Sequence, residues 1–267
     1  MDSPFFDRKY ELEKGKKLLS NGKFDLIIVY GRRRIGKTRY VKELTKNSKF
    51  IYNMGVNSSY NANLKMFQNN CAKSIPLIAD LKEDYEIILK AIKNSVDVVI
   101  LDEYPYMIKK DDLLSSLLQY FIDHEYKQTK MNIILLGSSI SMMKNLNAQP
   151  SPLFGRKSAT IKLEPMKFWE IQYFHPDCSF EELLEIYGIT DGIPRYLESI
   201  ETPLWNWLEN ELYYQYLLGD EINVILNMEF REPAKYFDIL DAIAVGKLRY
   251  GEIANFINMK VSDLSGY

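Results

Sequence analysis

The chain has 267 residues, 46% of them hydrophobic and 26% charged, which is typical of a globular protein that buries a core of its own. Its 34 basic and 36 acidic side chains give a formal net charge of −2, which excludes a protein that coats nucleic acid by bulk positive charge. Because Cys71 and Cys178 lie far apart and the histidines number only two, we expect no disulfide scaffold, no zinc site and a reducing, cytoplasmic location. The sequence has neither a basic leader nor about 18 consecutive apolar residues, so we expect no signal peptide and no contact with a membrane.

Short apolar runs alternate with longer helical patterns up to about residue 165, which predicts a parallel α/β sheet. The runs expected as strands are residues 25–30, 50–56, 97–101, 132–136 and 159–163, the last of which alternates like an edge strand. A helix is expected over residues 37–46, and apolar stripes at helical spacing predict further helices around 85–92 and 113–122. From residue 168 onward only helical patterns occur, so we expect a small all-helical region after the sheet.

The first predicted strand runs directly into the sequence GRRRIGKT, from Gly31 to Thr38. It matches the pattern G-x-x-x-x-G-K-[ST] and has the preceding strand and following helix that the pattern requires. Gly31 and Gly36 allow backbone angles that turn successive N–H groups toward phosphate oxygens, and the N-terminus of the helix adds its partial positive charge. We therefore expect Lys37 to reach the β- and γ-phosphates of a nucleotide, and the Thr38 hydroxyl to bind Mg²⁺.

Three consecutive arginines, Arg32, Arg33 and Arg34, lie inside this loop. As loop positions they are expected to project their side chains outward, and a nucleic-acid patch is the less favoured alternative. Together with Ile35 and Arg39 they complete the segment that we assign to nucleotide binding.

Polar side chains also end two of the predicted strands. Asp102 and Glu103 come at the carboxyl end of a buried strand, the edge of a parallel sheet where ligands bind. Asp102 is expected to hold Mg²⁺, through water or through Thr38. Glu103 is expected to polarise a water for in-line attack on a γ-phosphate, which favours hydrolysis over phosphorylation of a small molecule. After the next strand we assign Ser138, with Ser139 second, to sensing the γ-phosphate or the attacking water; the alternative is a serine that caps the following helix.

The order of these motifs resembles the AAA+ and STAND group of P-loop ATPases, and more narrowly the archaeal-type ATPase family, whose members carry a GRRRxGKT loop. The resemblance covers residues 5 to about 199 well and the later residues more weakly. It implies a three-layer α/β core with five parallel strands in the order 5-1-4-3-2, followed by a helical lid. It also implies ATP rather than GTP as the nucleotide, and the sequence contains no guanine-reading Asn-Lys-x-Asp motif.

The resemblance assigns further residues. An opening pattern of an aromatic residue followed by x-Arg-x-x-Glu-Leu matches Phe6 to Leu12 and implies that Arg8 lies near the adenine. In SPLFGRKS, Arg156 matches an arginine able to act on the γ-phosphate of a neighbouring subunit in a homo-oligomer, and a surface salt bridge is the alternative. In TDGIPRYL, Pro194 would shape the turn of the lid and Arg195 would contact phosphate.

Residues 234–254 resemble the start of a winged helix-turn-helix, with Ile239, Leu240 and Ile243 as its core face. The chain reaches Tyr267 where the recognition helix of such a module begins, so we expect a partial, C-terminally truncated unit that binds DNA poorly. The predicted domains are a P-loop ATPase core at 1–166, a helical lid at 167–232 and the partial winged helix at 233–267.

The sequence therefore predicts a Mg²⁺-dependent enzyme that binds and hydrolyses ATP. The alternative is a nucleotide-gated molecular switch, or a DNA-binding regulator, with little turnover. A small-molecule kinase is a third reading of the same loop.

Overall fold

The computed structural model describes residues 5, 8–109, 112–125, 129–146, 148–214, 218–230 and 232–267. It consists of two compact units, Met1–Ser199 and Ile200–Tyr267. Residues 167–199 belong to the same compact unit as the sheet. The functional division into core, lid and partial winged helix stays a prediction. Phe6, the first residue of the opening pattern, lies outside the described residues.

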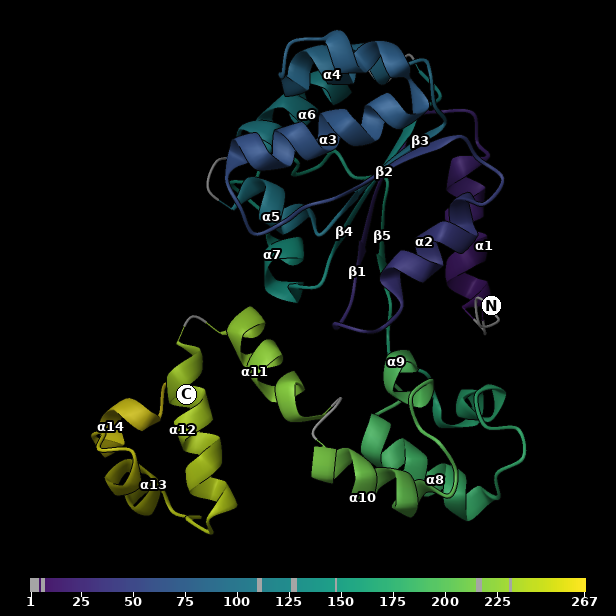
Figure 1. The fold of residues 1–267 in the computed structure, drawn as a ribbon. Helices are drawn as coiled ribbons and strands as arrows, with labels where there is room; N and C mark the ends of the chain where they lie inside the picture. Colours follow the sequence, from purple (N-terminus) through teal and green to yellow (C-terminus); the bar gives the residue numbers. More distant parts are fainter. Residues whose placement is uncertain are drawn as a thin grey trace. The chain divides into compact units, whose positions relative to one another are not determined.

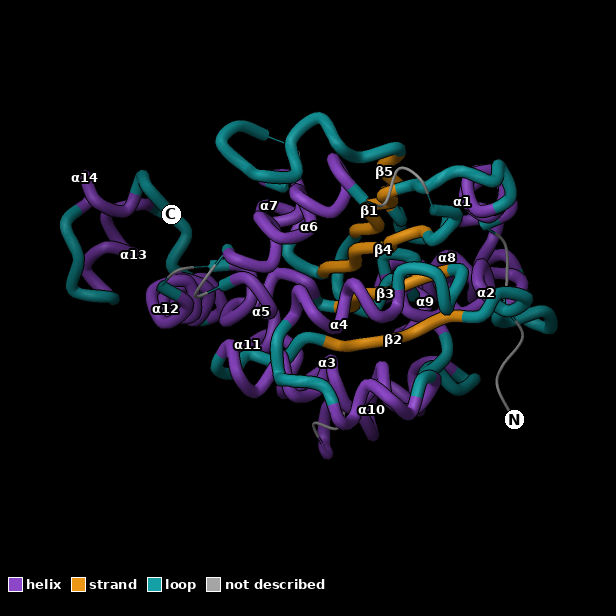
Figure 2. The backbone as a smooth tube through the Cα atoms, turned by 90° about the horizontal axis from the view of Figure 1, so that it is seen from above, coloured by secondary structure: helices purple, strands orange, loops and turns teal. Residues whose placement is uncertain are grey.

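A five-stranded parallel sheet forms the centre of the first unit (Figures 1 and 2). Its strands are β1 (Leu26–Tyr30), β2 (Phe50–Met54), β3 (Val98–Asp102), β4 (Asn132–Gly137) and β5 (Ala159–Lys162). They lie in the order β2-β3-β4-β1-β5, which confirms the predicted order read from the opposite edge. The three central strands are buried throughout because consecutive Ile, Val and Leu side chains face a helical layer on either side.

Successive side chains of β1 enter two different cores. Leu26 and Ile28 join a cluster that packs against α3 (Tyr60–Ser74), α4 (Tyr85–Ile92) and α6 (Leu113–His124). Ile27 and Val29 join a second cluster, which packs against α1 (Lys9–Leu19) and α2 (Lys37–Thr45). This alternation is the two-residue period of a strand, and it produces the three-layer α/β fold seen in Figure 1. The described residues of the sheet region also form the short α5 (Tyr104–Ile108), α7 (Ile140–Asn145) and the 3₁₀ turn Pro76–Asp80.

A helical segment follows β5 within the same unit. It contains a 3₁₀ turn (Phe168–Tyr173), α8 (Phe180–Thr190) and α9 (Pro194–Leu197). Between the last two helices, Gly192 has a φ of 67°, and a Cβ there would lie 2.1 Å from the Met166 carbonyl oxygen. The Met166 N–H donates to the Gly192 carbonyl at 2.8 Å, so the turn is pinned to the segment that leaves β5. Only glycine fits this position, and the turn fixes where α9 begins.

The second unit is helical in its described residues, with α10 (Leu204–Tyr214), α11 (Leu218–Glu229), α12 (Pro233–Ala244), α13 (Tyr250–Phe256) and α14 (Val261–Leu264). The last three helices share a small core, whose buried members are Ala242, Ile253, Ala254 and Leu264. Ile239 packs against this core as predicted. The prediction is wrong for Leu240 and Ile243, which are 47% and 44% exposed, because the packed face of α12 runs through Ile239 and Ala242. In the described part of the chain no helix is both long and apolar enough to cross a membrane.

Candidate functional site

The loop from Gly31 to Gly36 connects β1 to α2 and has an unusual backbone. Arg34 and Gly36 both have positive φ, 63° and 89°, which turns the chain sharply before the helix begins at Lys37. A Cβ on Gly31 would lie 2.4 Å from the Leu163 carbonyl oxygen, so glycine lets the loop start directly beside the end of β5. The glycines at both ends of the motif are therefore required by the fold of the loop.

Lys37, the first residue of α2, folds back onto the loop that precedes it. Its Nζ donates to the carbonyl oxygens of Gly31 and Arg32, at 3.0 Å each, and the residue is only 6% exposed. The ammonium group is thus held within the loop, next to the N-terminus of the helix. Both features attract an anion to the same place.

Asp102, at the end of β3, joins α2 to the sheet. Its Oδ2 accepts a hydrogen bond from Thr38 Oγ1 at 2.7 Å and another from the Tyr52 hydroxyl at 2.7 Å. Its Oδ1 accepts the backbone N–H of Glu103 at 2.8 Å. Burial, followed by the hydrogen bond to Asp102, raises the pKa of Tyr52, so the phenol stays a neutral donor. Sequence reasoning paired Thr38 with Asp102 and missed Tyr52, which belongs to no motif.

Glu103 and Ser138 meet across neighbouring strands. Glu103 adopts a left-handed conformation, with a φ of 47°, as the chain turns from β3 into α5. Its Oε1 accepts the Ser138 hydroxyl at 2.5 Å and its Oε2 accepts the Ser138 N–H at 3.3 Å. The next serine, Ser139, instead caps α7 by accepting the N–H of Met142. The two serines therefore have different partners, and the capping role belongs to Ser139.

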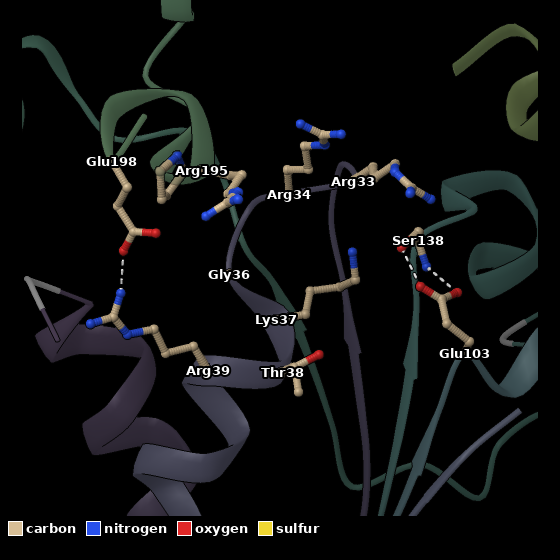
Figure 3. A pocket seen from close by; sticks show the side chains of 11 residues that line it. Arg33, Arg34, Gly36, Lys37, Thr38, Arg39, Glu103, Ser138, Arg195 and Glu198 are labelled. Carbon is tan, nitrogen blue, oxygen red and sulfur yellow. Dashed lines mark hydrogen bonds and ion pairs between the residues drawn. The ribbon is translucent and has the colours of Figure 1, made fainter. Parts of the chain in front are cut away.

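A pocket of about 510 Å³ lies over this loop (Figure 3). Lys37, Thr38, Glu103 and Ser138 line its floor, so the structure brings these four residues together. The other lining residues are Arg33, Arg34, Gly36, Arg39, Pro194, Arg195 and Glu198. Five cationic and two acidic side chains thus surround it, so the pocket suits a ligand with several negative charges.

The three arginines of the loop have different surroundings. Arg32 is not among the residues that line the pocket, is more than half exposed, and pairs with Asp191 at 2.5 Å. Arg33 extends toward Ser138, whereas Arg34 points away from Arg33 and from Ser138 (Figure 3). The guanidinium carbon of Arg34 lies 5.6 Å from the centre of the Tyr196 ring. The expectation that all three project outward is wrong for Arg33 and Arg34, which line the pocket because the backbone turns at Arg34.

A second set of contacts joins α2 to the segment around α9. Arg39 forms an ion pair with Glu198, and both side chains are about two-thirds buried or more. Pro194 and Arg195 line the pocket, and their roles in shaping the lid and contacting phosphate stay predictions. With the Arg32–Asp191 pair, these contacts connect the loop and its helix to the segment 191–198.

Arg8 lies beside a small apolar cavity of about 30 Å³, which shares Gly36, Arg39 and Pro194 with the main pocket. Its Nη2 donates to the Ile35 carbonyl at 3.2 Å, and Ile35 itself is fully buried. Phe5 and Phe174 also line this cavity. The assignment of Arg8 to an adenine site stays a prediction, and its location next to the loop is compatible with it.

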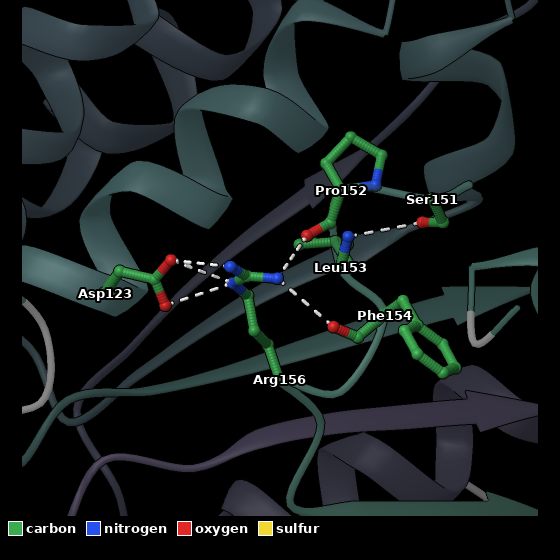
Figure 4. A network of polar contacts seen from close by, with 6 residues as sticks. All are labelled: Asp123, Ser151, Pro152, Leu153, Phe154 and Arg156. Atoms are coloured by element: carbon green, nitrogen blue, oxygen red, sulfur yellow. Dashed lines mark hydrogen bonds and ion pairs between the residues drawn. The ribbon is translucent and has the colours of Figure 1, made fainter. Parts of the chain in front are cut away.

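Arg156 lies outside the pocket and has a dense set of partners (Figure 4). Its Nε and Nη2 donate to the Asp123 carboxylate at 2.7–3.1 Å. Its Nη1 donates to the carbonyl oxygens of Pro152 and Phe154 at 3.0 and 3.2 Å. These bonds fix the segment before β5 to α6, and the action of Arg156 on a neighbouring subunit stays a prediction.

The oxygen ligands around Thr38 fit a small hard cation. Mg²⁺ in proteins is commonly held by one or two side-chain oxygens together with phosphate oxygens and water. A threonine hydroxyl already bonded to a strand-end carboxylate at 2.7 Å supplies that set, and it lies at the floor of the pocket. Elsewhere among the described residues, no group of three or more His, Cys, Asp or Glu side chains gathers as a metal site.

Comparison with known proteins agrees with this geometry. A family described as an ATPase domain predominantly from Archaea matches residues 5–200. MJECL04, an uncharacterized protein of Methanocaldococcus jannaschii, is 40% identical over 98% of this chain and 59% of its own length. A second protein of that organism, MJ1637, is 27% identical over 91% of this chain and 48% of its own length. The chain thus spans about half the length of the curated relatives it matches.

Solved structures share the fold at low sequence identity. The Walker-type ATPase PABY2304 of Pyrococcus abyssi is 19% identical, with 95% of this chain and 84% of that chain covered and a TM-score of 0.66. The Aeropyrum pernix ORC1 protein, solved in complex with DNA, is 13% identical, with 98% and 82% covered and a TM-score of 0.57. Since the family match spans most of the sequence and the fold agrees, the chain belongs to the family of ATPase domains found predominantly in Archaea, a group of P-loop ATPases.

Proposed function

We propose that this chain binds ATP with Mg²⁺ and hydrolyses it to ADP and phosphate. The observation that carries the proposal is the 2.7 Å hydrogen bond to Asp102 from Thr38, which lines the same pocket as Lys37 and Glu103. A phosphate-binding loop, a cation ligand and a carboxylate able to polarise water thereby meet within one cavity. The strongly cationic lining supports a triphosphate as the ligand.

Each residue has a distinct role in the proposed reaction. The loop N–H groups and Lys37 bind the β- and γ-phosphates and stabilise the charge that develops on them. Thr38 would hold Mg²⁺ directly, and Asp102 orients the Thr38 hydroxyl. Bound Mg²⁺ would neutralise negative charge on the phosphates. Glu103 orients a water and accepts its proton as the water oxygen bonds to the γ-phosphorus and the bond to the β–γ bridging oxygen breaks.

Ser138 positions the carboxylate of Glu103. Each oxygen of that carboxylate accepts one hydrogen bond from Ser138. A carboxylate oxygen offers two acceptor sites, so both oxygens keep one for a water near the γ-phosphate. We propose that Ser138 orients Glu103 in this way and that its hydroxyl contacts the γ-phosphate or the attacking water.

Phosphate release measured with and without variants of the floor residues tests this function. Lys37→Ala should abolish ATP binding and turnover, because it removes the cation held within the loop. Glu103→Gln should retain ATP binding and lose turnover by at least about 100-fold, in the range general base catalysis contributes. Lys42→Ala, an exposed lysine of the same helix, is the matched control and should leave both unchanged. Unchanged ATP affinity in Lys37→Ala would refute the assignment of the site.

A second candidate, a nucleotide-gated switch with slow turnover, is favoured by the ion pairs Arg32–Asp191 and Arg39–Glu198. These contacts join the nucleotide loop and its helix to the segment 191–198, so occupancy of the pocket can change how this segment is held. Tight ATP retention without phosphate release, together with nucleotide-dependent protection of that segment from hydrogen exchange, would favour the switch over the ATPase.

The proposed partners of the chain are DNA and further copies of the chain. DNA would bind through α12–α14, and the copies would form a homo-oligomer that uses Arg156. They are supported by a structural neighbour that was solved with DNA and by the resemblance described above. Binding to a fluorescent duplex and the mass of the particle in solution, each with and without ATP, test them.

A further inference from the structure

Tyr52 reaches the metal-binding side of the site from the edge strand β2. Tyr52 lies opposite Ile100 in the register of β2 and β3. Ile100 is two residues before Asp102 on β3, so both point to the same face of the sheet. From there its hydroxyl crosses to Asp102 and donates to Oδ2 at 2.7 Å, the same oxygen that accepts the Thr38 hydroxyl. One carboxylate oxygen thus joins an edge strand to the first turn of α2.

These hydrogen bonds restrict the carboxylate of Asp102. Oδ2 accepts from two hydroxyls, and Oδ1 accepts the N–H of Glu103 at 2.8 Å. A carboxylate oxygen offers two acceptor sites, so Oδ2 is fully used by Thr38 and Tyr52. The carboxylate plane is therefore fixed from both sides. Thr38 uses its single hydrogen on Asp102, which leaves the lone pairs of its oxygen directed away from the carboxylate and available to a cation.

The hydroxyl of Tyr52 suits this role. It donates its one hydrogen to Asp102 Oδ2 at 2.7 Å. The ring packs beside the apolar cluster between the sheet and α2, which fixes the direction of the hydroxyl. The sheet and the helix therefore hold the donor in place without help from a ligand.

We propose that Tyr52 is a positioning residue for the divalent cation of the nucleotide site. This inference rests on the proposed function and extends it. By fixing Asp102, Tyr52 aims the Thr38 hydroxyl at the cation and keeps Asp102 as an outer partner, bonded to Thr38 and to cation-bound water. Tyr52 itself touches neither nucleotide nor cation. Outer partners of this kind typically change metal affinity by about 10–100-fold.

Tyr52→Phe tests the proposal because it removes one oxygen and keeps the ring. The 267-residue chain is mixed with a fluorescent ATP analogue in EDTA. Mg²⁺ is then added, and the measured quantity is the Mg²⁺ concentration at which half of the change in affinity for the analogue is reached. We expect this concentration to rise about tenfold in Tyr52→Phe. The affinity for the analogue in EDTA should stay within a factor of about two, since no contact to the phosphates is lost.

Tyr40→Phe is the matched control. Tyr40 lies on α2, and its buried hydroxyl donates to the Glu11 carbonyl at 2.7 Å instead of to Asp102. This variant should keep the Mg²⁺ requirement of the unmodified protein.

A second readout uses Mn²⁺ in place of Mg²⁺. Electron paramagnetic resonance counts the Mn²⁺ held by the complex with the analogue, and Tyr52→Phe should hold Mn²⁺ about tenfold more weakly.

The results separate this inference from the proposed function. If the unmodified chain binds the analogue and Tyr52→Phe needs the same Mg²⁺ and Mn²⁺ concentrations, the inference is overturned while the function stands. An equal loss of affinity in EDTA and in Mg²⁺ also overturns it, because it would mean that Tyr52 only supports the fold. If the unmodified chain fails to bind the analogue at all, the proposed function fails first and the inference falls with it.

Discussion

Replacing Gly192 by alanine tests the turn that brings Pro194 and Arg195 to the pocket. A Cβ at this position would lie 2.1 Å from the Met166 carbonyl oxygen, whereas non-bonded atoms normally stay about 3.5 Å apart. Met166 is poorly placed to retreat, because its own N–H donates to the Gly192 carbonyl at 2.8 Å. The left-handed φ of 67° adds about 1–2 kcal/mol for any residue with a Cβ, and the overlap adds about 1–3 kcal/mol. We therefore expect Gly192→Ala to destabilise the first unit by about 2–5 kcal/mol.

Gly155→Ala isolates the conformational part of this cost. Gly155 also has a positive φ, 75°, but nothing lies within 4 Å of the place where its Cβ would be. Its replacement should cost only about 1–2 kcal/mol. Thermal unfolding of both variants gives the difference, at about 2–4 °C per kcal/mol for a unit of this size. Nucleotide titrations should show weaker binding for Gly192→Ala alone, because only that turn leads into the pocket. Equal unfolding temperatures for the two variants would refute the placement of Gly192 against Met166.

Three further predictions follow from single contacts. Ser138→Ala should lower phosphate release about tenfold at unchanged ATP affinity, because one polar contact is lost. Ser139→Ala should instead lower stability by about 1 kcal/mol through loss of a helix cap and leave turnover intact. Arg156→Ala should lower the unfolding temperature through loss of its carboxylate and carbonyl partners. If Arg156 also acts between subunits, mixing this variant with one that lacks the catalytic carboxylate should restore turnover. Cys178, which is partly exposed, should react with a thiol reagent in the native protein, and Cys71 only upon unfolding, since burial raises the pKa of Cys71 to about 12.

The fold could be predicted because its signals are local. Each central strand is a run of Ile, Val and Leu that must be buried on both faces, and each such run is followed by a helical pattern. The strand order could not be obtained from these patterns alone. It came from the resemblance of the motifs to a known group of ATPases, and the sheet confirms it. Strand ends shifted by one or two residues, as at β3, which includes Asp102.

The chemistry of the loop was equally predictable, since its residues are adjacent in sequence and its glycines meet strict steric limits. The directions of the arginine side chains in the loop were less predictable. Arg32, Arg33 and Arg34 are neighbours, yet one pairs with Asp191, one extends toward Ser138 and one lies by Tyr196. The positive φ of Arg34 rotates the chain within the loop, and no sequence pattern signals it in a residue other than glycine.

Tyr52 shows why a residue outside every motif escapes sequence reasoning. The sequence predicted β2 as a strand, and the resemblance placed it beside β3. Those two facts still leave the register open, and a slip of one residue would send the Tyr52 side chain to the opposite face, away from Asp102 and α2. Only the observed pairing of Tyr52 with Ile100 places its hydroxyl on the face that carries Asp102. A contact that depends on the register of two strands therefore has to be read from the structure, and the most informative variants of this site are those of residues placed by register.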